Sequence, residues 1–249
     1  MSLSGLTRSR VQADHALLTP ESHVPCMLPG WRDATLTILV SPRIGAGFTQ
    51  FYVDLLAGGA TAPPQDGIQR FVYVMEGELD ADVGDGKRRV GAGAYIYTPA
   101  GHAHTLEACA PTRLLVFEKP WVPLGDSVPE PVLAHERDVV AEPFLGDPDA
   151  MLKTFLPVDD RYDMAINHFT FVPGATLPMV EVHVMEHGLT LLSGAGVYRL
   201  GDSWYTVQKG DSIWMAPYLP QWFCATGKTP TSYIYYKDMN RDVYAAGQR

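Results

Sequence analysis

The chain has 249 residues with 28 acidic and 19 basic side chains, which gives a formal net charge of −9. This acidity argues against a nucleic-acid partner, and no segment is apolar enough for a membrane span or a signal peptide. Three widely spaced cysteines (Cys26, Cys109 and Cys224) do not make a disulfide framework, so we expect a reducing, cytoplasmic compartment.

Short β-branched and aromatic runs separated by Gly and Pro predict strands along most of the chain. Residues 1 to about 30 are expected to form an arm with one short strand at 15–20. The Pro-rich, acidic stretch from 121 to about 155 predicts a linker with at most one short helix near Val139. The other expected strands cover 35–40, 51–55, 70–75, 78–83, 94–97, 113–117, 164–172, 187–192, 196–200, 212–215 and 232–236.

Residues 181–187 carry the strongest metal-binding pattern. If they form a strand, Glu181, His183 and His187 share one face, whereas Glu186 points away and is solvated. The alternation of valines at 180, 182 and 184 favours a strand over a helix, in which the first and last of these ligands would lie apart. The alternative is a surface strand that carries two histidines by chance.

The second half of the chain repeats the first. Shifting the sequence by 117 positions places Gly77 on Gly194 and Gly93 on Gly210. This duplication predicts two double-sheet barrels of the jelly-roll type. The expected domains are an N-terminal arm and barrel (1–125), a linker (126–155) and a C-terminal barrel (156–249).

These motifs resemble those of the cupin family, so the expected fold is an all-β bicupin with two tandem double-stranded β-helix barrels. In the second half the first cupin motif is similar to Gly174…Glu181-Val182-His183…His187…Gly194, and Gln221 takes the final histidine position of the second motif. The resemblance implies a metal site made of Glu181, His183, His187 and Gln221.

In the first half the second cupin motif is intact as Gly93…Pro99-Ala100-Gly101…His104. The ligand positions of its first motif, however, hold Pro64, Asp66 and Arg70. A guanidinium where a cation should sit excludes a metal by charge, so we expect an N-terminal barrel without a metal site.

The unusual Glu-His-His-Gln set and the ending Tyr233-x3-Lys237 resemble the family of (S)-ureidoglycine aminohydrolases, manganese-dependent bicupins of allantoin breakdown. The resemblance implies hydrolysis of ureidoglycine to ureidoglycolate and ammonia, with one Mn²⁺ per chain and a homo-oligomer. Glu181, Lys237 and Tyr233 are then the candidate catalytic residues, and Gln221 and Tyr198 join them in binding the substrate. The alternative roles are a core aromatic for Tyr233 and a surface lysine for Lys237.

Two imidazoles, a carboxylate and an amide oxygen suit octahedral Mn²⁺ or Fe²⁺. One ligand carboxylate would leave a divalent ion with a net charge of about +1, which suits a small anionic substrate. Two other functions stay open: an Fe²⁺-dependent cupin dioxygenase or isomerase, and a non-catalytic bicupin that binds a ligand.

Overall fold

A computed structural model describes residues 7–241. Within that range the chain forms strands and short 3-10 helices and contains no α-helix, which confirms the all-β prediction. No helix in these residues is long and apolar enough to cross a membrane. The described chain divides into two compact units, which we call the N-terminal unit (24–43 and 47–138) and the C-terminal unit (7–23, 44–46 and 139–241).

The N-terminal unit is one antiparallel sheet in the order β12-β9-β6-β11-β5-β10-β7-β8, with β4 paired to β5 and β3 to β4. Its apolar core includes Phe51, Val72 and Leu114, which alternate with residues on the opposite face of their strands. Its strands are β3 (Pro25–Cys26), β4 (Arg32–Val40), β5 (Thr49–Ala60), β6 (Ile68–Glu76), β7 (Glu78–Asp82), β8 (Arg88–Gly91), β9 (Ala94–Thr98), β10 (Thr105–Ala108), β11 (Thr112–Pro120) and β12 (Val132–His135). The 3-10 helix η3 (Glu136–Asp138) follows β12, and η2 (Pro42–Ile44) begins in this unit and ends at Ile44 of the C-terminal unit.

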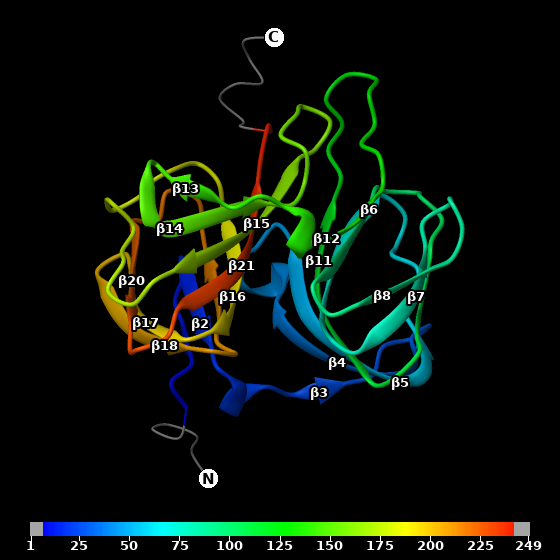
Figure 1. The fold of residues 1–249 in the computed structure, drawn as a ribbon, viewed down its shortest axis with the longest axis horizontal. Helices are drawn as coiled ribbons and strands as arrows, with labels where there is room; N and C mark the ends of the chain where they lie inside the picture. Colours follow the sequence, from blue (N-terminus) through cyan, green and yellow to red (C-terminus); the bar gives the residue numbers. More distant parts are fainter. Residues whose placement is uncertain (1–6, 242–249) are drawn as a thin grey trace. The chain divides into compact units, whose positions relative to one another are not determined.

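The C-terminal unit contains two antiparallel sheets (Figure 1). Eight strands follow the order β1-β2-β19-β16-β21-β15-β14-β13, and three follow β18-β17-β20. Aromatic side chains such as Phe169, Phe171 and Phe223 fill its core. Its elements are β1 (Arg10–Val11), β2 (His15–Leu18), η1 (Pro20–Ser22), β13 (Glu142–Phe144), β14 (Asp147–Thr154), β15 (Met164–Phe171), β16 (His187–Ser193), β17 (Ala195–Leu200), β18 (Ser203–Gln208), β19 (Ser212–Met215), β20 (Gln221–Thr226) and β21 (Thr231–Asp238).

The repeat seen in the sequence is visible as an equivalent turn in both units. Gly77 lies between β6 and β7 with φ 85°, and Gly194 lies between β16 and β17 with φ 70°. A Cβ atom at either glycine would collide with the threonine that begins the next paired strand, Thr112 or Thr231. Each turn therefore requires glycine for its positive φ and for the close approach of a neighbouring strand.

Residues 7–23 of the predicted arm belong to the C-terminal unit, which differs from the predicted domain 1–125, whereas residues 24–30 belong to the N-terminal unit. Strand β2 pairs with β19, with His15 opposite Met215, and the side chain of Leu17 lies in the C-terminal core. The carboxylate of Asp211 is fully buried and accepts two hydrogen bonds of 2.7 Å from the guanidinium of Arg8. The arm thus extends the sheet that carries the C-terminal site.

The stretch predicted as a linker (126–155) is also structured. Strand β12 pairs with β9 in the N-terminal unit, while β13 and β14 form a hairpin that pairs with β15 in the C-terminal unit. Pro143 is tolerated because β13 is the edge strand of its sheet. The linker prediction is therefore wrong for most of this stretch, and its helix near Val139 is the 3-10 turn η3.

Replacing Arg8 with alanine is expected to lower the free energy of unfolding of the C-terminal unit by about 2 kcal/mol, because the buried carboxylate of Asp211 loses its charged donor. Urea denaturation followed by tryptophan fluorescence measures the change. Arg10→Ala is the matched control, since the Arg10 guanidinium donates to the nearby arm carbonyls of Thr7 and Ser9 rather than to a buried carboxylate. Equal stability of the two variants would contradict the observed docking of the arm.

Candidate metal and substrate site

The segment predicted as a strand over 181–187 is an extended loop that becomes a strand only at its last residue. Glu181 forms an isolated bridge with Gln221, through backbone hydrogen bonds of 2.8 Å and 2.9 Å. Further along, the carbonyl of His183 accepts a hydrogen bond from the backbone N–H of Tyr218, and His187 begins β16. The prediction of one continuous strand over residues 181–187 is therefore wrong. The predicted ligands nevertheless reach one pocket, since the loop is fixed at both ends.

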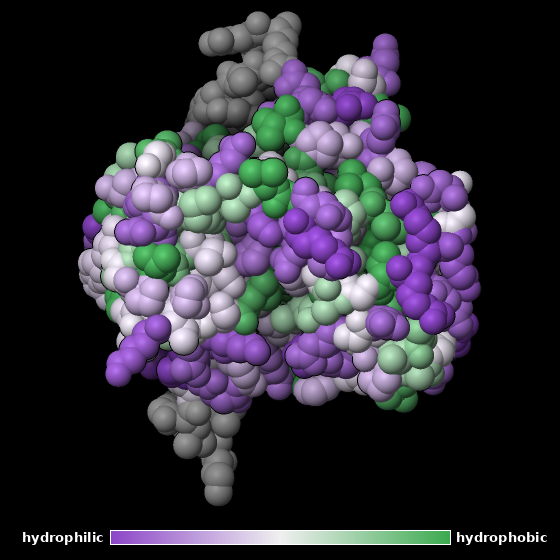
Figure 2. Space-filling view, in the orientation of Figure 1, coloured by the Kyte–Doolittle hydropathy of each residue, from purple (hydrophilic) through white to green (hydrophobic). Residues whose placement is uncertain are grey.

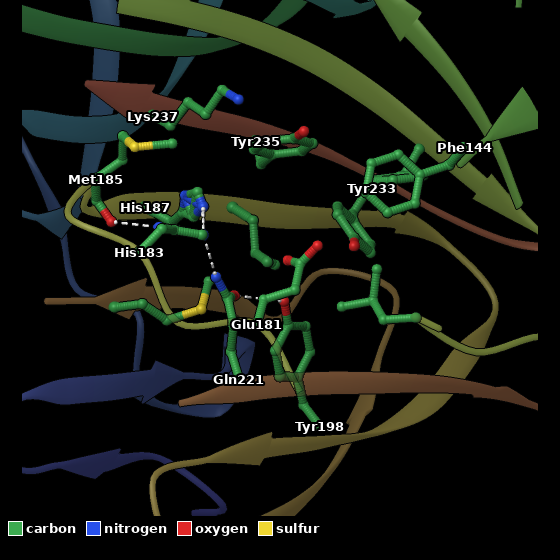
Figure 3. A pocket seen from close by; sticks show the side chains of 14 residues that line it. Phe144, Glu181, His183, Met185, His187, Tyr198, Gln221, Tyr233, Tyr235 and Lys237 are labelled. Carbon is green, nitrogen blue, oxygen red and sulfur yellow. Dashed lines mark hydrogen bonds between the residues drawn. The ribbon is translucent and has the colours of Figure 1, made fainter. Parts of the chain in front are cut away.

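All seven side chains predicted for the site line this pocket of the C-terminal unit (Figure 3). They come from the loop before β16 and from strands β16, β17, β20 and β21. In Figure 3, His183 and His187 lie side by side at one end, while Phe144 lies at the other. The complete lining is Phe144, Phe169, Leu177, Glu181, His183, Met185, His187, Leu189, Tyr198, Met215, Gln221, Tyr233, Tyr235 and Lys237.

The two imidazoles have the geometry of cation ligands. Their Nε2 atoms lie 3.1 Å apart, and the Nδ1–H of His183 donates to the carbonyl of Met185, which leaves its Nε2 lone pair facing the pocket. Nδ1 of His187 is buried and finds no hydrogen-bond partner among residues 7–241. Burial lowers the pKa of both histidines, so both are neutral near pH 7. Two neutral rings that meet through nitrogen are suited to share a cation.

Gln221 completes a group of three polar side chains at this point. Its amide nitrogen lies 3.0 Å from Nε2 of His183, and its oxygen accepts a hydrogen bond of 3.3 Å from the hydroxyl of Tyr198. An amide carries both a donor and an acceptor, and a half-turn about its last bond offers the oxygen to the cation position. The donor set of His183, His187 and Gln221 therefore fits a borderline-hard divalent metal.

The Glu181 carboxylate is turned away from the imidazoles, toward Tyr233 and Tyr198 (Figure 3). Across residues 7–241, no three His, Cys, Asp or Glu side chains gather as a ready metal cluster. Burial raises the pKa of Glu181, and the ammonium of Lys237 acts in the opposite direction. The structure thus brings together three of the four predicted ligands, and the fourth occupies the same pocket in another orientation.

Tyr233 and Lys237 both face the pocket from β21, as the predicted spacing requires. The hydroxyl of Tyr198 donates to the oxygen of Gln221, and Tyr233 and Tyr198 lie close enough for each phenol to affect the pKa of the other. Burial raises the pKa of both phenols, so both remain protonated donors at neutral pH. Burial lowers the pKa of Lys237, and Glu181 partly offsets this effect. Tyr233 is also part of the C-terminal core, 3% exposed and packed against Phe169 and Phe171, so the alternative of a core aromatic describes its packing as well. Lys237 is partly buried and lines the pocket, which differs from an exposed surface lysine.

Sequence reasoning missed four aromatic or thioether side chains of the pocket. Tyr235 packs edge-on against His187, with ring centroids 5.5 Å apart, and Phe144 packs against Phe169 in the same way at 4.9 Å. Met215 pairs with His187 across β19 and β16. The alternation of Tyr233, Tyr235 and Lys237 could have indicated Tyr235, whereas Phe144 lies in the stretch read as a linker.

In the N-terminal unit, Arg70 occupies the position that corresponds to His187. Its guanidinium is 2% exposed, donates to Glu118 and to the carbonyl of Ala62 at 2.6 Å each, and lies 5.3 Å from the ring of Trp31. Burial lowers the pKa of Arg70, and Glu118 counteracts the shift. The N-terminal unit therefore has a buried guanidinium paired with a carboxylate at the position where the C-terminal unit has the imidazole of His187.

Replacing Arg70 with alanine is expected to destabilise the N-terminal unit by about 2 kcal/mol, because Glu118 loses its charged partner. The expected loss is smaller than for a fully buried ion pair, because the Glu118 side chain is 22% exposed and water can solvate its carboxylate. Chemical denaturation measures it, with Arg89→Ala in an exposed pair as the control. The metal content per chain should not change. A second metal equivalent in Arg70→Ala would show that this charge alone keeps metal out.

The comparison with protein families agrees with the repeated architecture. A family model described as "Cupin domain" matches residues 51–118 and again residues 167–236, one match in each unit. The two matched segments together cover more than half of the chain. The predicted tandem cupin fold is thereby confirmed.

Two relatives carry the same enzyme name. The chain is 39% identical over 244 residues to (S)-ureidoglycine aminohydrolase of Arabidopsis thaliana, covering 96% of this chain and 80% of the relative. It is 34% identical over 233 residues to (S)-ureidoglycine aminohydrolase of Escherichia coli K12, covering 92% and 89%. The crystal structure of protein Ylba from E. coli superposes with a TM-score of 0.85 at 33% identity, covering 95% of this chain and 96% of that one.

Proposed function

The chain belongs to the cupin domain family and, within it, to the (S)-ureidoglycine aminohydrolases, and from this membership we propose that it converts (S)-ureidoglycine to (S)-ureidoglycolate and ammonia in allantoin catabolism. The observation that carries the proposal is the pocket itself. It joins an imidazole pair, an amide, a carboxylate and an ammonium, which are the groups needed to bind a metal together with a small anionic aminal.

We propose that His183, His187, Gln221 and Glu181 hold one Mn²⁺. The two imidazole Nε2 atoms that face each other and the nearby Gln221 amide support this set. Rotation of the Glu181 side chain would let its carboxylate join them. When bound, a divalent ion supplies a template and a charge anchor for the substrate. A divalent ion bound by one ligand carboxylate would have a net charge of about +1, which favours a substrate with an α-carboxylate.

Lys237 is the proposed partner of that substrate carboxylate. Its side chain lines the pocket opposite His187 in the β16–β21 ladder, so an ammonium lies beside the imidazole pair. Tyr233 remains protonated and can donate a hydrogen bond to the ureido oxygen. The hydroxyl of Tyr198, which donates to Gln221, would be released for the same purpose when the Gln221 amide turns its oxygen toward the metal. Together these donors fix which face of the reacting carbon is exposed to water.

Glu181 is the proposed proton shuttle. Burial raises the pKa of its carboxyl group, which brings the group closer to the range useful for proton transfer near neutrality. In the reaction the bond between the central carbon and the amine nitrogen breaks, the amine leaves as ammonia after gaining a proton, and water supplies the new hydroxyl group. Both a direct displacement and an acylimine route, assisted by the ureido nitrogen, use Glu181 in this way.

The proposal is tested by measuring ammonia release from freshly generated ureidoglycine, with and without Mn²⁺, in the wild-type protein and in Glu181→Ala. Rapid, Mn²⁺-stimulated release by the wild type and its loss in the variant are expected. Glu142→Ala, an exposed acid on β13, is the control. Absence of metal-dependent ammonia would remove the proposed activity. Oxygen uptake on another substrate would instead favour the Fe²⁺ dioxygenase, and binding without turnover the non-catalytic bicupin.

We further propose that the enzyme works in the cytoplasm as a homo-oligomer. Its three cysteines are free, which suits a reducing compartment. Large apolar side chains such as Met27 (84% exposed) and Val24 (75% exposed) reach the surface. The face shown in Figure 2 carries several apolar patches interrupted by polar residues. Self-association would cover part of this surface.

A further inference from the structure

Asp238 lies where the end of strand β21 meets the loop that carries His183. It directly follows Lys237 and ends its strand opposite Met164 of β15. The next residues are anchored on the same unit: the N–H of Met239 donates to the carbonyl of Asp163 at 3.0 Å. The position of Asp238 is therefore fixed by contacts that do not involve the pocket.

The carboxylate of Asp238 reaches back to the loop. Its Oδ1 accepts a hydrogen bond of 2.6 Å from the backbone N–H of Glu186, the residue before His187. A carboxylate that accepts from a backbone amide makes a short, charge-assisted bond. This bond ties the turn between the two histidines to the strand that carries Lys237.

Glu186 adds a second attachment on the outer side of the sheet. Its side chain is only 7% exposed, and one oxygen accepts a hydrogen bond of 3.3 Å from the indole N–H of Trp214. In the same turn, the carbonyl of Met185 accepts from Nδ1 of His183 and so orients that imidazole. The backbone of residues 185–186 thus transmits the position of Asp238 to His183.

We propose that Asp238 is a positioning residue: by holding the Glu186 amide it keeps the His183 imidazole beside His187 and thereby sets the metal affinity of the site. This inference rests on the proposed metal site and deepens it. Asp238 would then act through the carboxylate oxygen that accepts from the Glu186 amide, and not through its negative charge near the cation.

Two substitutions separate these causes. Asp238→Asn keeps an acceptor oxygen but removes the charge, and Asp238→Ala removes both. We expect Asp238→Ala to weaken Mn²⁺ binding about tenfold or more, the range found when an outer partner of a ligand is lost. Asp238→Asn should remain within about threefold of the wild type. Asp202→Ala, a fully exposed carboxylate of the same unit, is the control.

The experiment measures the Mn²⁺ dissociation constant of the full chain by competition with a fluorescent chelator, together with the thermal midpoint of each variant. Rescue by asparagine, in folded variants, supports the proposal. It is overturned if Asp238→Asn binds as weakly as Asp238→Ala, which would assign the effect to charge, or if both bind like the wild type. Failure of the aminohydrolase proposal is distinguishable, since it appears as missing ammonia release with metal binding intact.

Discussion

Replacing His187 with alanine is expected to abolish stoichiometric Mn²⁺ binding and to lower kcat/KM for ureidoglycine by roughly 10³-fold, the several kcal/mol that a metal template contributes. The side chain is 6% exposed and its Nε2 lies 3.1 Å from that of His183, so alanine at this position removes half of the imidazole pair. Metal content by mass spectrometry and ammonia release measure the two effects.

His168→Ala is the matched control for this variant. His168 lies on β15 of the same unit but does not line the pocket. It should therefore keep one metal per chain, whatever its effect on stability. If His187→Ala retained a full equivalent of metal and most of its activity, the imidazole pair could not be the centre of the site.

Replacing Lys237 with methionine is expected to raise KM about thirtyfold while the metal content stays at one per chain. Methionine keeps the length of the stem but loses the charge, and a hydrogen bond to a charged group contributes roughly 2 kcal/mol. The side chain faces the pocket beside Glu181 without belonging to the imidazole pair. Steady-state kinetics with the Mn²⁺-loaded protein measure the change.

Lys228→Met, in the exposed turn after β20, controls for the loss of one positive charge from the unit. A KM within threefold of the wild-type value in Lys237→Met would show that the substrate carboxylate is bound elsewhere. Loss of metal in the same variant would mean that Lys237 supports the ligands rather than the substrate.

Local spacing and the repeat were enough to predict which side chains line one pocket, whose role as a metal and substrate site stays a proposal. The alternation of Tyr233 and Lys237 on β21 holds in the structure as the two-residue period requires. For Glu181 and His183 the same period predicted a strand, which is wrong. The valines of this segment, such as Val182 at 55% exposure, are not a buried strand face, and long-range bonds to residues 218 and 221 hold the loop instead.

Glu186 illustrates a partial success. It points away from the pocket as predicted, but it is buried against Trp214 rather than solvated. Sequence reasoning could not supply this partner, because Trp214 lies on β19 and reaches Glu186 only through sheet pairing. A local pattern gives the direction of a side chain but not what covers the face to which it points.

The arm and the supposed linker were misplaced for a related reason. Strand β2 finds its place through pairing with β19, about 200 residues away, and nothing in its local composition indicates that partner. Strand β13 is a three-residue edge strand, and the neighbouring β14 begins with Asp147-Pro148-Asp149; exposed residues such as Val140 and Leu145 lie nearby. Such composition is typical of loops, so only their pairing with β15 identifies them as strands.

The central claim is that one metal ion binds inside the C-terminal unit between two imidazoles, an amide and a carboxylate. Anomalous diffraction from crystals of the Mn²⁺-loaded protein, recorded on both sides of the manganese edge, tests it most directly. The expected result is a single peak per chain within bonding distance of His183, His187, Gln221 and Glu181. A peak only in the N-terminal unit, or none among these side chains, would contradict it.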